Sequence, residues 1–493
     1  MITLPSCDDL GGVSGDEASW RKLFQGSRCR LIENVPARTG NYVTLSYCWG
    51  TALPYTTTSK SLQQHLAGLY FVQLPKTLQD AIMVARYLGF RYIWIDCICI
   101  VQDDEQDWAR EAARMADIYS KSALCIAASR ASNCDERFLH LRNIEHWTHV
   151  PVDDKEDTFS LYIYEDPAYG DLKQPLGIRA WAYQERLLSN RLLSFTSDGC
   201  TWNCRSLYAR EDGLTIKSRD LLNEVADALE SDDGWADQNV PHLEDDRLPH
   251  LSWWRFIEDY QRLLLTDTTD KLPALSGIVA RLEQLTGDVC FAGLWQKHFL
   301  RGLLWFTTEP DAQHLEQWLA PSWSFAALAG DVLYHLTTKP LTFLMKFEEC
   351  RLQPVDVNNP LGKLAAGFVR LHCPVITLRI MKILGQESSN KYLAADSFVG
   401  RTALHDEYEL EVIVYLDDRS DFGRLKKSHI PPIGDHEVVI CEALVVTTDH
   451  AIIVQTLDTT GAEYTRLGLA SIRHWSRNYP KSAVPEPRSI VLL

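Results

Sequence analysis

Between residues 42 and 129 the chain alternates segments typical of buried strands with segments typical of amphipathic helices. Good strand formers fill YVTLSYCWG (42–50), and the apolar runs RYIWIDCICIV (91–101) and ALCIAAS (123–129) follow later. Helical periodicity occupies the two connections between them, residues 74–90 and 102–122. This order of strand, helix, strand, helix and strand predicts a parallel α/β sheet with right-handed crossovers.

The first of these helices is marked at both ends. Its apolar residues recur at helical spacing, namely Leu78, Ala81, Ile82, Ala85 and Leu88. Thr77, with Asp80 three residues later, resembles a capping box. Gly89 suits the position just after a helix end, where a left-handed backbone is common. We therefore predict a helix over residues 74–90.

Asp96 interrupts the apolar run 91–101, which otherwise predicts a parallel strand buried on both faces. A buried charge is costly unless it has a partner. We expect Asp96 to cap the next segment or order a loop, with contact to a ligand as the alternative. Asp103 and Asp104 are expected to begin the following helix, where negative charge suits the helix dipole.

The remaining sequence indicates further regions. Two strand-like runs within residues 130–178 predict an inserted hairpin, and a helix is expected over residues 178–188. The acidic stretch ESDDGWADQNVPHLEDD (230–246) is the best domain boundary. The predicted organisation is an N-terminal extension (1–28), an α/β domain (29–215), an acidic linker (216–250), a helical segment (251–320) and a β-rich module (321–493).

Charge and hydropathy exclude some classes of protein. Lys and Arg number 49 against 66 Asp and Glu, a net charge of −17, which argues against a general binder of nucleic acid or anionic membranes. The N-terminal residues lack the pattern of a secretory signal, and no apolar run reaches the roughly 20 residues of a membrane helix. We expect a soluble cytoplasmic protein without a membrane span.

The 13 cysteines form no CxxC pair, and the histidines show no metal-site spacing, so no metal ion is expected. Cys97, Cys99 and Cys125 lie in apolar runs, where a free thiol behaves as a small hydrophobic side chain. A catalytic Cys99 is the alternative for this group.

Three segments together resemble the blocks of the fungal heterokaryon incompatibility (HET) domain. They are YVTLSYCWG, the long stretch from LPKTLQDAIM to SALCIAA, and RAWAYQERLLSNRLLSF (179–195). The resemblance implies a role in non-self recognition and regulated cell death when incompatible fungal cells fuse. It also implies a flavodoxin-like α/β sheet related to TIR domains. The third block of the family usually reads Gly-Trp-Thr, whereas this chain has Ala180-Trp181-Ala182 and so lacks one hydroxyl group.

Some TIR domains cleave NAD at the nicotinamide–ribose bond with a glutamate in a Trp-x-x-x-Glu pattern. By that likeness Glu185 becomes the candidate catalytic carboxylate, four residues after Trp181. A carboxylate near the ribose stabilises the oxocarbenium-like centre that forms as the bond breaks. NAD would be the substrate, and no cofactor is expected. Residues at the carboxyl ends of the strands line the ligand crevice of an open α/β sheet. Ser46, Tyr47, Trp49 and Asp96 lie at or near such ends and are predicted to bind the substrate. Trp181 joins them because an aromatic ring, Trp181 or Trp49, would stack on the base.

Structural alternatives remain for these residues. Glu185 could form an ion pair with Arg179, Arg186 or Arg191 that clamps its helix to the sheet. Trp181 could be a core aromatic residue. Glu136, in the polar stretch SNCDERF after the third strand, is the rival catalytic carboxylate.

Three functions follow from these readings. The first is an NAD hydrolase of the TIR-like kind. The second is a non-enzymatic signalling module in which the same surface mediates self-association or binds a protein partner. The third is a repurposed enzyme that acts on another small molecule through Cys99 or a histidine. An enzyme predicts a cleft beside Glu185, whereas a scaffold predicts a glutamate paired with arginine.

Overall fold

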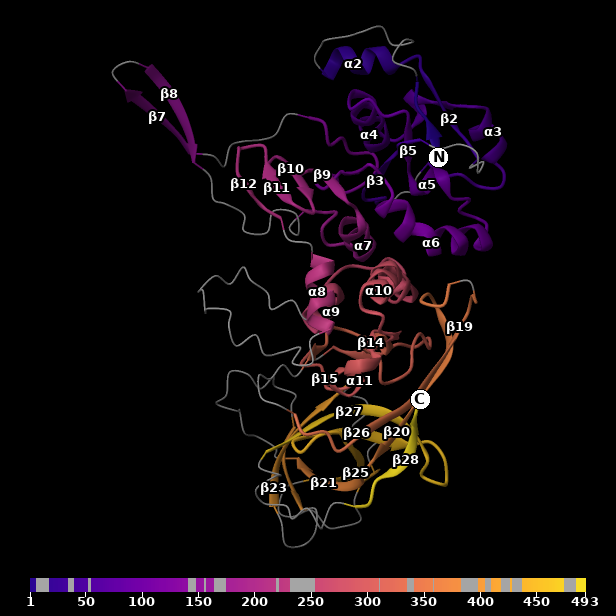
Figure 1. The fold of residues 1–493 in the computed structure, drawn as a ribbon, viewed down its shortest axis with the longest axis vertical. Helices are drawn as coiled ribbons and strands as arrows, with labels where there is room; N and C mark the ends of the chain where they lie inside the picture. Colours follow the sequence, from indigo (N-terminus) through magenta and orange to yellow (C-terminus); the bar gives the residue numbers. More distant parts are fainter. Residues whose placement is uncertain are drawn as a thin grey trace. The chain divides into compact units, whose positions relative to one another are not determined.

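The computed structural model divides the chain into two compact units, Met1–Asp220 and Leu221–Leu493. Figure 1 shows the fold of both units as a ribbon. The structure describes residues 1–5, 17–33, 40–51, 55–140, 148–154, 157–163, 174–218, 221–230, 253–309, 311–334, 341–357, 359–382, 398–403, 409–417, 426–427, 437–473 and 485–493. No helix in these ranges is long and apolar enough to cross a membrane. The predicted linker 216–250 lies largely outside them.

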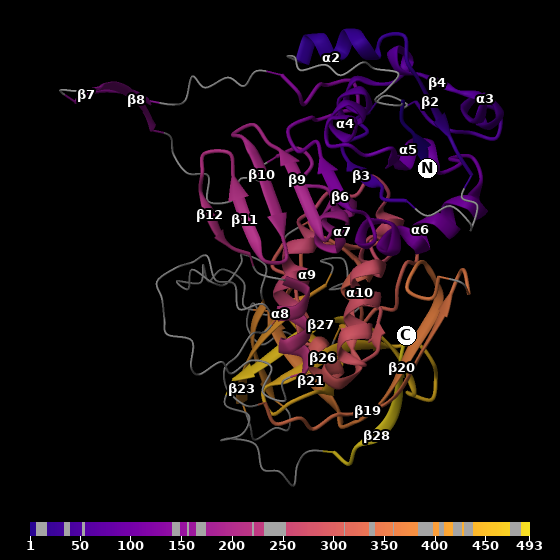
Figure 2. The same cartoon turned by 45° about the horizontal axis from the view of Figure 1, so that its top comes forward.

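A mixed sheet of ten strands forms the first unit, in the order β12-β11-β10-β9-β6-β3-β5-β1-β2-β4 (Figure 2). Its strands are β1 (Ile2–Thr3), β2 (Arg28–Leu31), β3 (Val43–Ser46), β4 (Leu69–Tyr70), β5 (Tyr92–Trp94), β6 (Leu124–Ala127), β9 (Arg191–Phe195), β10 (Cys200–Cys204), β11 (Leu207–Arg210) and β12 (Thr215–Lys217). The pairs β5–β3, β3–β6 and β6–β9 are parallel, and the others are antiparallel. The predicted parallel α/β core is therefore confirmed, flanked by antiparallel strands.

The helices of this unit, apart from the first, lie in the connections between the parallel strands. They are α2 (Glu17–Phe24), α3 (Leu62–Ala67), η1 (Phe71–Gln73), α4 (Lys76–Tyr87), α5 (Asp96–Cys99), α6 (Glu105–Ser120) and α7 (Ala180–Leu188). The apolar stripe of α4, including Leu78 and Ile82, packs in one core with Val43, Ile93 and Ile126 of the strands. The periodicity of residues 74–90 and 102–122 thus predicted both long helices correctly.

The inserted hairpin is also confirmed. Strands β7 (Thr148–Asp154) and β8 (Asp157–Ile163) pair antiparallel and join no other strand of the described residues.

Two predictions for this unit were wrong. The strand expected over 91–101 ends at Trp94, because a helical turn, α5, begins at Asp96. The Asp96 carboxylate accepts a hydrogen bond from the Cys97 amide at 2.7 Å, and the Cys99 amide donates to the Ile95 carbonyl. Asp96 thus ends the strand rather than lying within it.

The capping box at the start of α4 is the second error. The N-cap residue is Pro75, and no side chain caps the helix. Thr77 instead donates its hydroxyl to the carbonyls of Asn133 and Glu136, and Asp80 forms ion pairs with Arg21 and Arg137 at 2.7 and 2.8 Å. Both side chains therefore hold the loop that follows β6. Gly89, with φ of +84°, occupies the predicted position after the helix end.

The second unit begins with helices and continues as a β-rich region, as expected. Its helices are α8 (Leu221–Glu230), α9 (Trp253–Gln261), η2 (Thr268–Asp270), α10 (Pro273–Thr286), η3 (Gln296–His298), α11 (Phe299–Gly302) and η4 (Phe325–Ala327). The short strands β13 (Cys290–Phe291), β14 (Leu294–Trp295), β15 (Trp305–Phe306), β16 (Gln313–His314), β17 (Leu328–Ala329) and β18 (Leu333–Tyr334) form two-stranded pairs.

A second ten-stranded sheet follows (Figure 1). Its strands are β19 (Lys346–Pro354), β20 (Leu364–Cys373), β21 (Val375–Lys382), β22 (Phe398–Ala403), β23 (Glu409–Leu416), β24 (Lys426–Lys427), β25 (Glu437–Val445), β26 (His450–Thr456), β27 (Glu463–Arg473) and β28 (Arg488–Leu492). Arg466 of β27 is fully buried. It pairs with Asp417 at 2.8 Å and donates to the Leu303 carbonyl at 2.7 Å, so it ties the sheet to the preceding segment.

Candidate functional site

The carboxyl ends of the four parallel strands lie at one edge of the first sheet, which is where ligands bind in open α/β sheets. Ser46 is the last residue of β3, and Tyr47 and Trp49 follow it directly. Asp96 lies two residues beyond β5. The structure therefore places these four predicted residues at one edge, on the segments that leave β3 and β5.

Glu185 reaches the same region from α7, with 7% of its surface exposed. The side chains of Ser46, from β3, and Tyr119, from α6, lie near its carboxylate. The pKa of Glu185 is raised to about 7, mainly by burial; the negative charge of Asp96 also raises this pKa, while Ser46, Arg179 and Tyr119 lower it. The Glu185 carboxyl group can therefore gain or lose a proton near neutral pH.

The ion pair considered for Glu185 is not present. Among the described residues, no arginine lies at ion-pair distance from this carboxylate; Arg179 acts on it from farther away. Arg186 instead stacks over the ring of Tyr183 at 5.2 Å, and Arg191 donates to the Ala123 carbonyl at 3.4 Å. A buried carboxylate that lacks a cation at contact distance is a poor structural clamp.

Asp96 and Trp49 form a fixed pair. The Trp49 indole N–H donates to one carboxylate oxygen of Asp96 at 2.8 Å, and the Cys97 amide donates to the other at 2.7 Å. Burial raises the pKa of Asp96, and these two donors counteract that rise. The arrangement orients the indole ring, so Asp96 has the loop-ordering role that was expected of it.

Tyr47 and Trp181 complete the predicted set. The Tyr47 hydroxyl is buried and has no hydrogen-bond partner within the described part of the chain, although Asp96 and Cys97 lie near it. Burial raises the pKa of this phenol well above its usual range. Trp181 lies one helical turn before Glu185 and is half-buried.

The rival carboxylate, Glu136, belongs to its own loop. It accepts hydrogen bonds from the Ser132 amide at 2.7 Å, the Ser132 hydroxyl at 2.9 Å and the Asn133 amide group at 3.1 Å. The Ser132 amide is the main cause of its lowered pKa. Because its oxygens are occupied by the turn, Glu136 orders the loop after β6.

A small cavity lies beside Ser46 and α7. It is lined by Ser46, Ala127, Ser129, Leu176, Gly177, Ala182, Tyr183, Arg186, Leu192 and Ser194, and its volume is about 20 Å³. One water molecule needs roughly 10–15 Å³ of such space. The cavity therefore accommodates a water molecule and is too small for a ribose ring in this conformation.

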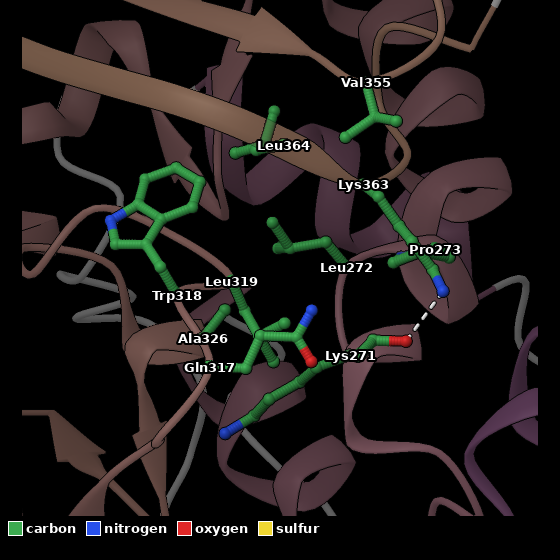
Figure 3. A pocket seen from close by; sticks show the side chains of 11 residues that line it. Lys271, Leu272, Pro273, Gln317, Trp318, Leu319, Ala326, Val355, Lys363 and Leu364 are labelled. Atoms are coloured by element: carbon green, nitrogen blue, oxygen red, sulfur yellow. Dashed lines mark hydrogen bonds between the residues drawn. The ribbon is translucent and has the colours of Figure 1, made fainter.

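A larger pocket, of about 100 Å³, lies in the second unit and contains none of the predicted residues (Figure 3). Its walls are mainly apolar, with Leu272, Leu319 and Leu364 facing one another. At its rim the Lys363 ammonium donates to the Thr269 hydroxyl at 2.7 Å.

Three cysteines of the first unit have buried thiols. Burial raises the pKa of Cys97, Cys99 and Cys125, so these thiols stay protonated. Within the ranges that the structure describes, no three His, Cys, Asp or Glu side chains are grouped to hold a metal ion.

Sequence reasoning missed two contacts, although it had named Arg179 as a possible partner of Glu185. Arg179 is the N-cap residue of α7, and its guanidinium donates to the Tyr47 carbonyl at 2.9 Å. Tyr119, at the end of α6, donates to the Leu45 carbonyl at 3.1 Å and also lies near Glu185. The apolar stripe of α6 passes near Tyr119, but nothing local indicates that its hydroxyl lies near Glu185.

Comparison with known proteins gives one match. Residues 42–185 match the model of the family described as heterokaryon incompatibility protein (HET). No curated protein and no solved structure matches the chain. The matched residues begin just before β3 and end at Glu185.

Proposed function

We propose that the chain, whose residues 42–185 match the model of the heterokaryon incompatibility (HET) family, acts in fungal non-self recognition and regulated cell death by hydrolysing NAD at Glu185. The proposal that the chain hydrolyses NAD rests on the surroundings of the Glu185 carboxylate. It is a buried carboxylate with no arginine at contact distance among the described residues, and it lies at the ligand-binding edge of the sheet.

The order of the parallel strands supports this assignment. In chain order β3, β5, β6 and β9 are the first to fourth, and across the sheet they run second, first, third, fourth. This is the order of flavodoxin-like sheets, the class to which TIR domains belong by the resemblance of the sequence. In such sheets the ligand crevice lies between two adjacent strands whose following connections cross opposite faces of the sheet. Here these strands are β3 and β6. Ser46, Tyr47 and Trp49 leave β3 at that point.

The proposed reaction breaks the bond between C1′ of the ribose and the nicotinamide nitrogen. The bonding electrons return to the already cationic ring, so nicotinamide leaves as a neutral base and needs no strong acid. The charged form of Glu185 stabilises the oxocarbenium-like sugar. Water then adds to C1′ and loses a proton, which gives ADP-ribose. Trp49, oriented by Asp96, and Trp181 would provide aromatic surfaces for the base.

The test is nicotinamide release from NAD by the full chain, concentrated with a crowding agent because TIR-like activity depends on assembly. Native protein should release nicotinamide, and Glu185→Gln should lose at least about 100-fold of the rate. Glu136→Gln is the matched control and should keep the rate, since its carboxylate only orders a loop. If Glu136→Gln lost nicotinamide release and Glu185→Gln kept it, Glu136 would be the catalytic carboxylate instead of Glu185.

The second candidate is a signalling module without enzymatic activity, in which the domain self-associates or binds a partner protein in the cytoplasm. It is favoured by the 20 Å³ cavity, because NAD cleavage requires the segments around Ser46 to move apart. No nicotinamide release by native protein under any assembly condition, with folded Glu185→Gln indistinguishable from it, would establish this alternative.

A further inference from the structure

We propose that the larger pocket of the second unit binds a small carboxylic acid with a branched or cyclic apolar body. All the residues that line it belong to the second unit, so this site goes beyond NAD hydrolysis and does not depend on it. Its walls come mainly from the start of α10, from residues 317–319 and from the connection between β19 and β20 (Figure 3). Segments far apart in the sequence therefore build one site.

The apolar part of the ligand would lie among leucine side chains. Leu272, Leu319 and Leu364 face one another, and the pocket they share has a volume of about 100 Å³ (Figure 3). Because a dry cavity of about 150 Å³ binds benzene, this pocket suits an apolar group of about four to six carbon atoms. Trp318 and Val355 also line it and are 45% and 65% exposed, so a ligand can enter from solvent. Exposed apolar side chains grouped in this way are typical of binding sites.

The charges of the pocket favour an acid. Two lysines, Lys271 and Lys363, line it, and among its described lining residues none carries a carboxylate, although the whole chain has a net charge of −17. Asp267 and Asp270, from the segment before α10, are not part of the lining. The start of α10 lies in the wall, and the first turn of this helix has no acidic residue. The positive end of the helix dipole and the lysines therefore both attract an anion.

The two lysines have different roles. The Lys363 ammonium donates to the Thr269 hydroxyl at 2.7 Å, which fixes it at the rim (Figure 3). Its ion pair with Asp270 is 3.6 Å long, more than a hydrogen bond, so a ligand carboxylate can approach the ammonium more closely than Asp270 does. Lys271 instead donates to the Leu328 carbonyl at 2.7 Å and so holds the segment that follows η4. Lys363 is therefore assigned to the carboxylate, and Lys271 shapes the wall.

The experiment titrates isocaproate into full chain labelled with ¹³C at leucine and valine methyl groups, and follows the Val355 methyl resonances by NMR. These resonances are assigned as the ones missing from Val355→Ala, a substitution at an exposed position. Isocaproate should bind at least about tenfold tighter than isohexanol, which has the same apolar body, because a hydrogen bond to a charged group is the stronger kind. Acetate has the charge without the body and should bind far more weakly than isocaproate.

Substitutions separate the two parts of the site. Lys363→Gln should lower the affinity for isocaproate about tenfold and leave that for isohexanol unchanged; Lys363→Met is the second variant should Lys363→Gln fail to fold. Lys346→Gln, at an exposed position of β19 outside the lining, is the matched control and should change neither affinity. Leu319→Phe should weaken the binding of both probes, because the larger ring takes the space of the apolar body.

Three outcomes would overturn this assignment. They are equal affinities of native protein for isocaproate and isohexanol, an unchanged affinity for isocaproate in Lys363→Gln, and Val355 resonances that do not move with any probe. None of these measurements reads nicotinamide release, so a failure here leaves the proposal of NAD hydrolysis untouched, and the reverse also holds.

Discussion

At the scale of single residues, the candidate site contains two carboxylates, Asp96 and Glu185, that have different surroundings. Asp96 is fixed by two donated hydrogen bonds, from Trp49 and Cys97. Glu185 lies near the hydroxyl groups of Ser46 and Tyr119. The positive charge of Arg179 lowers its pKa, and the negative charge of Asp96 raises it. These different surroundings give the two carboxyl groups different properties: Asp96 holds the Trp49 ring in place, and the pKa of Glu185 is raised to about 7.

The raised pKa of Glu185 predicts a pH-dependent stability. In the unfolded chain this carboxyl group titrates near 4.5 and in the folded chain near 7. Between these values the unfolded state gives up its proton first, so the free energy of unfolding falls as pH rises. The difference corresponds to about 3 kcal/mol. Denaturant unfolding should therefore show Glu185→Gln gaining stability over the native protein between pH 4.5 and pH 7.5.

Glu136→Gln is the opposite case. Its pKa is lowered in the folded state, so its charge stabilises the fold above its unfolded pKa and that contribution is lost as pH falls. This variant should be less stable than native protein at pH 7.5 and close to it at low pH. Parallel pH profiles for the two variants would contradict the assignment of both environments.

At the scale of elements, the loops that leave β3 and β6 meet closely at Gly50. Its φ is +82°, and an added Cβ would lie 2.4 Å from the Cβ of Asn133. Gly89 has a similar φ of +84° but open space around it. Both positions favour glycine for the backbone, and Gly50 also allows the approach of the two loops.

The two glycines form a matched pair for substitution. Gly89→Ala should cost about 1–2 kcal/mol from the left-handed backbone alone. Gly50→Ala should cost at least about 1 kcal/mol more, because the loops must separate. Equal losses of unfolding free energy in the two variants would show that the loops do not meet as described.

Much of the element pattern was predictable, because helical periodicity and apolar runs are local. Residues 74–90, 102–122 and 178–188 each became a helix close to the expected bounds. The break after Trp94 was not predictable from hydropathy, since it arises when the Asp96 side chain bonds the next amide. The roles of Thr77 and Asp80 were also missed, because their partners lie more than fifty residues away. The Trp-x-x-x-Glu spacing singled out Glu185, whose catalytic role stays a prediction, whereas Arg179 and Tyr119 make tertiary contacts that no local pattern indicates.

At the scale of the whole molecule, the division into two compact units predicts two unfolding transitions. Each unit contains a fully buried carboxylate with arginine partners, Asp80 in the first and Asp417 in the second. Removing one partner of a buried pair costs about 3–5 kcal/mol. Asp80→Asn should lower one calorimetric transition by on the order of 10 °C, and Arg466→Met should lower the other.

The exposed pair of Asp117 and Lys121 supplies the control for this experiment. Both side chains are largely exposed, so Asp117→Asn should leave both transitions nearly unchanged. A single transition that moves as one in both buried-pair variants would mean that the units unfold together.

The hairpin β7–β8 has a consequence for how such a chain can diversify. It interrupts the connection between β6 and β9, which are adjacent in the sheet, yet it pairs only with itself among the described strands. The entropy of closing a connection grows only logarithmically with its length, about 0.6 kcal/mol for each doubling. A longer, shorter or different hairpin between β6 and β9 would therefore change the stability of the sheet very little. The hairpin is a position where one scaffold can acquire new recognition surfaces while the edge that holds Glu185 stays the same.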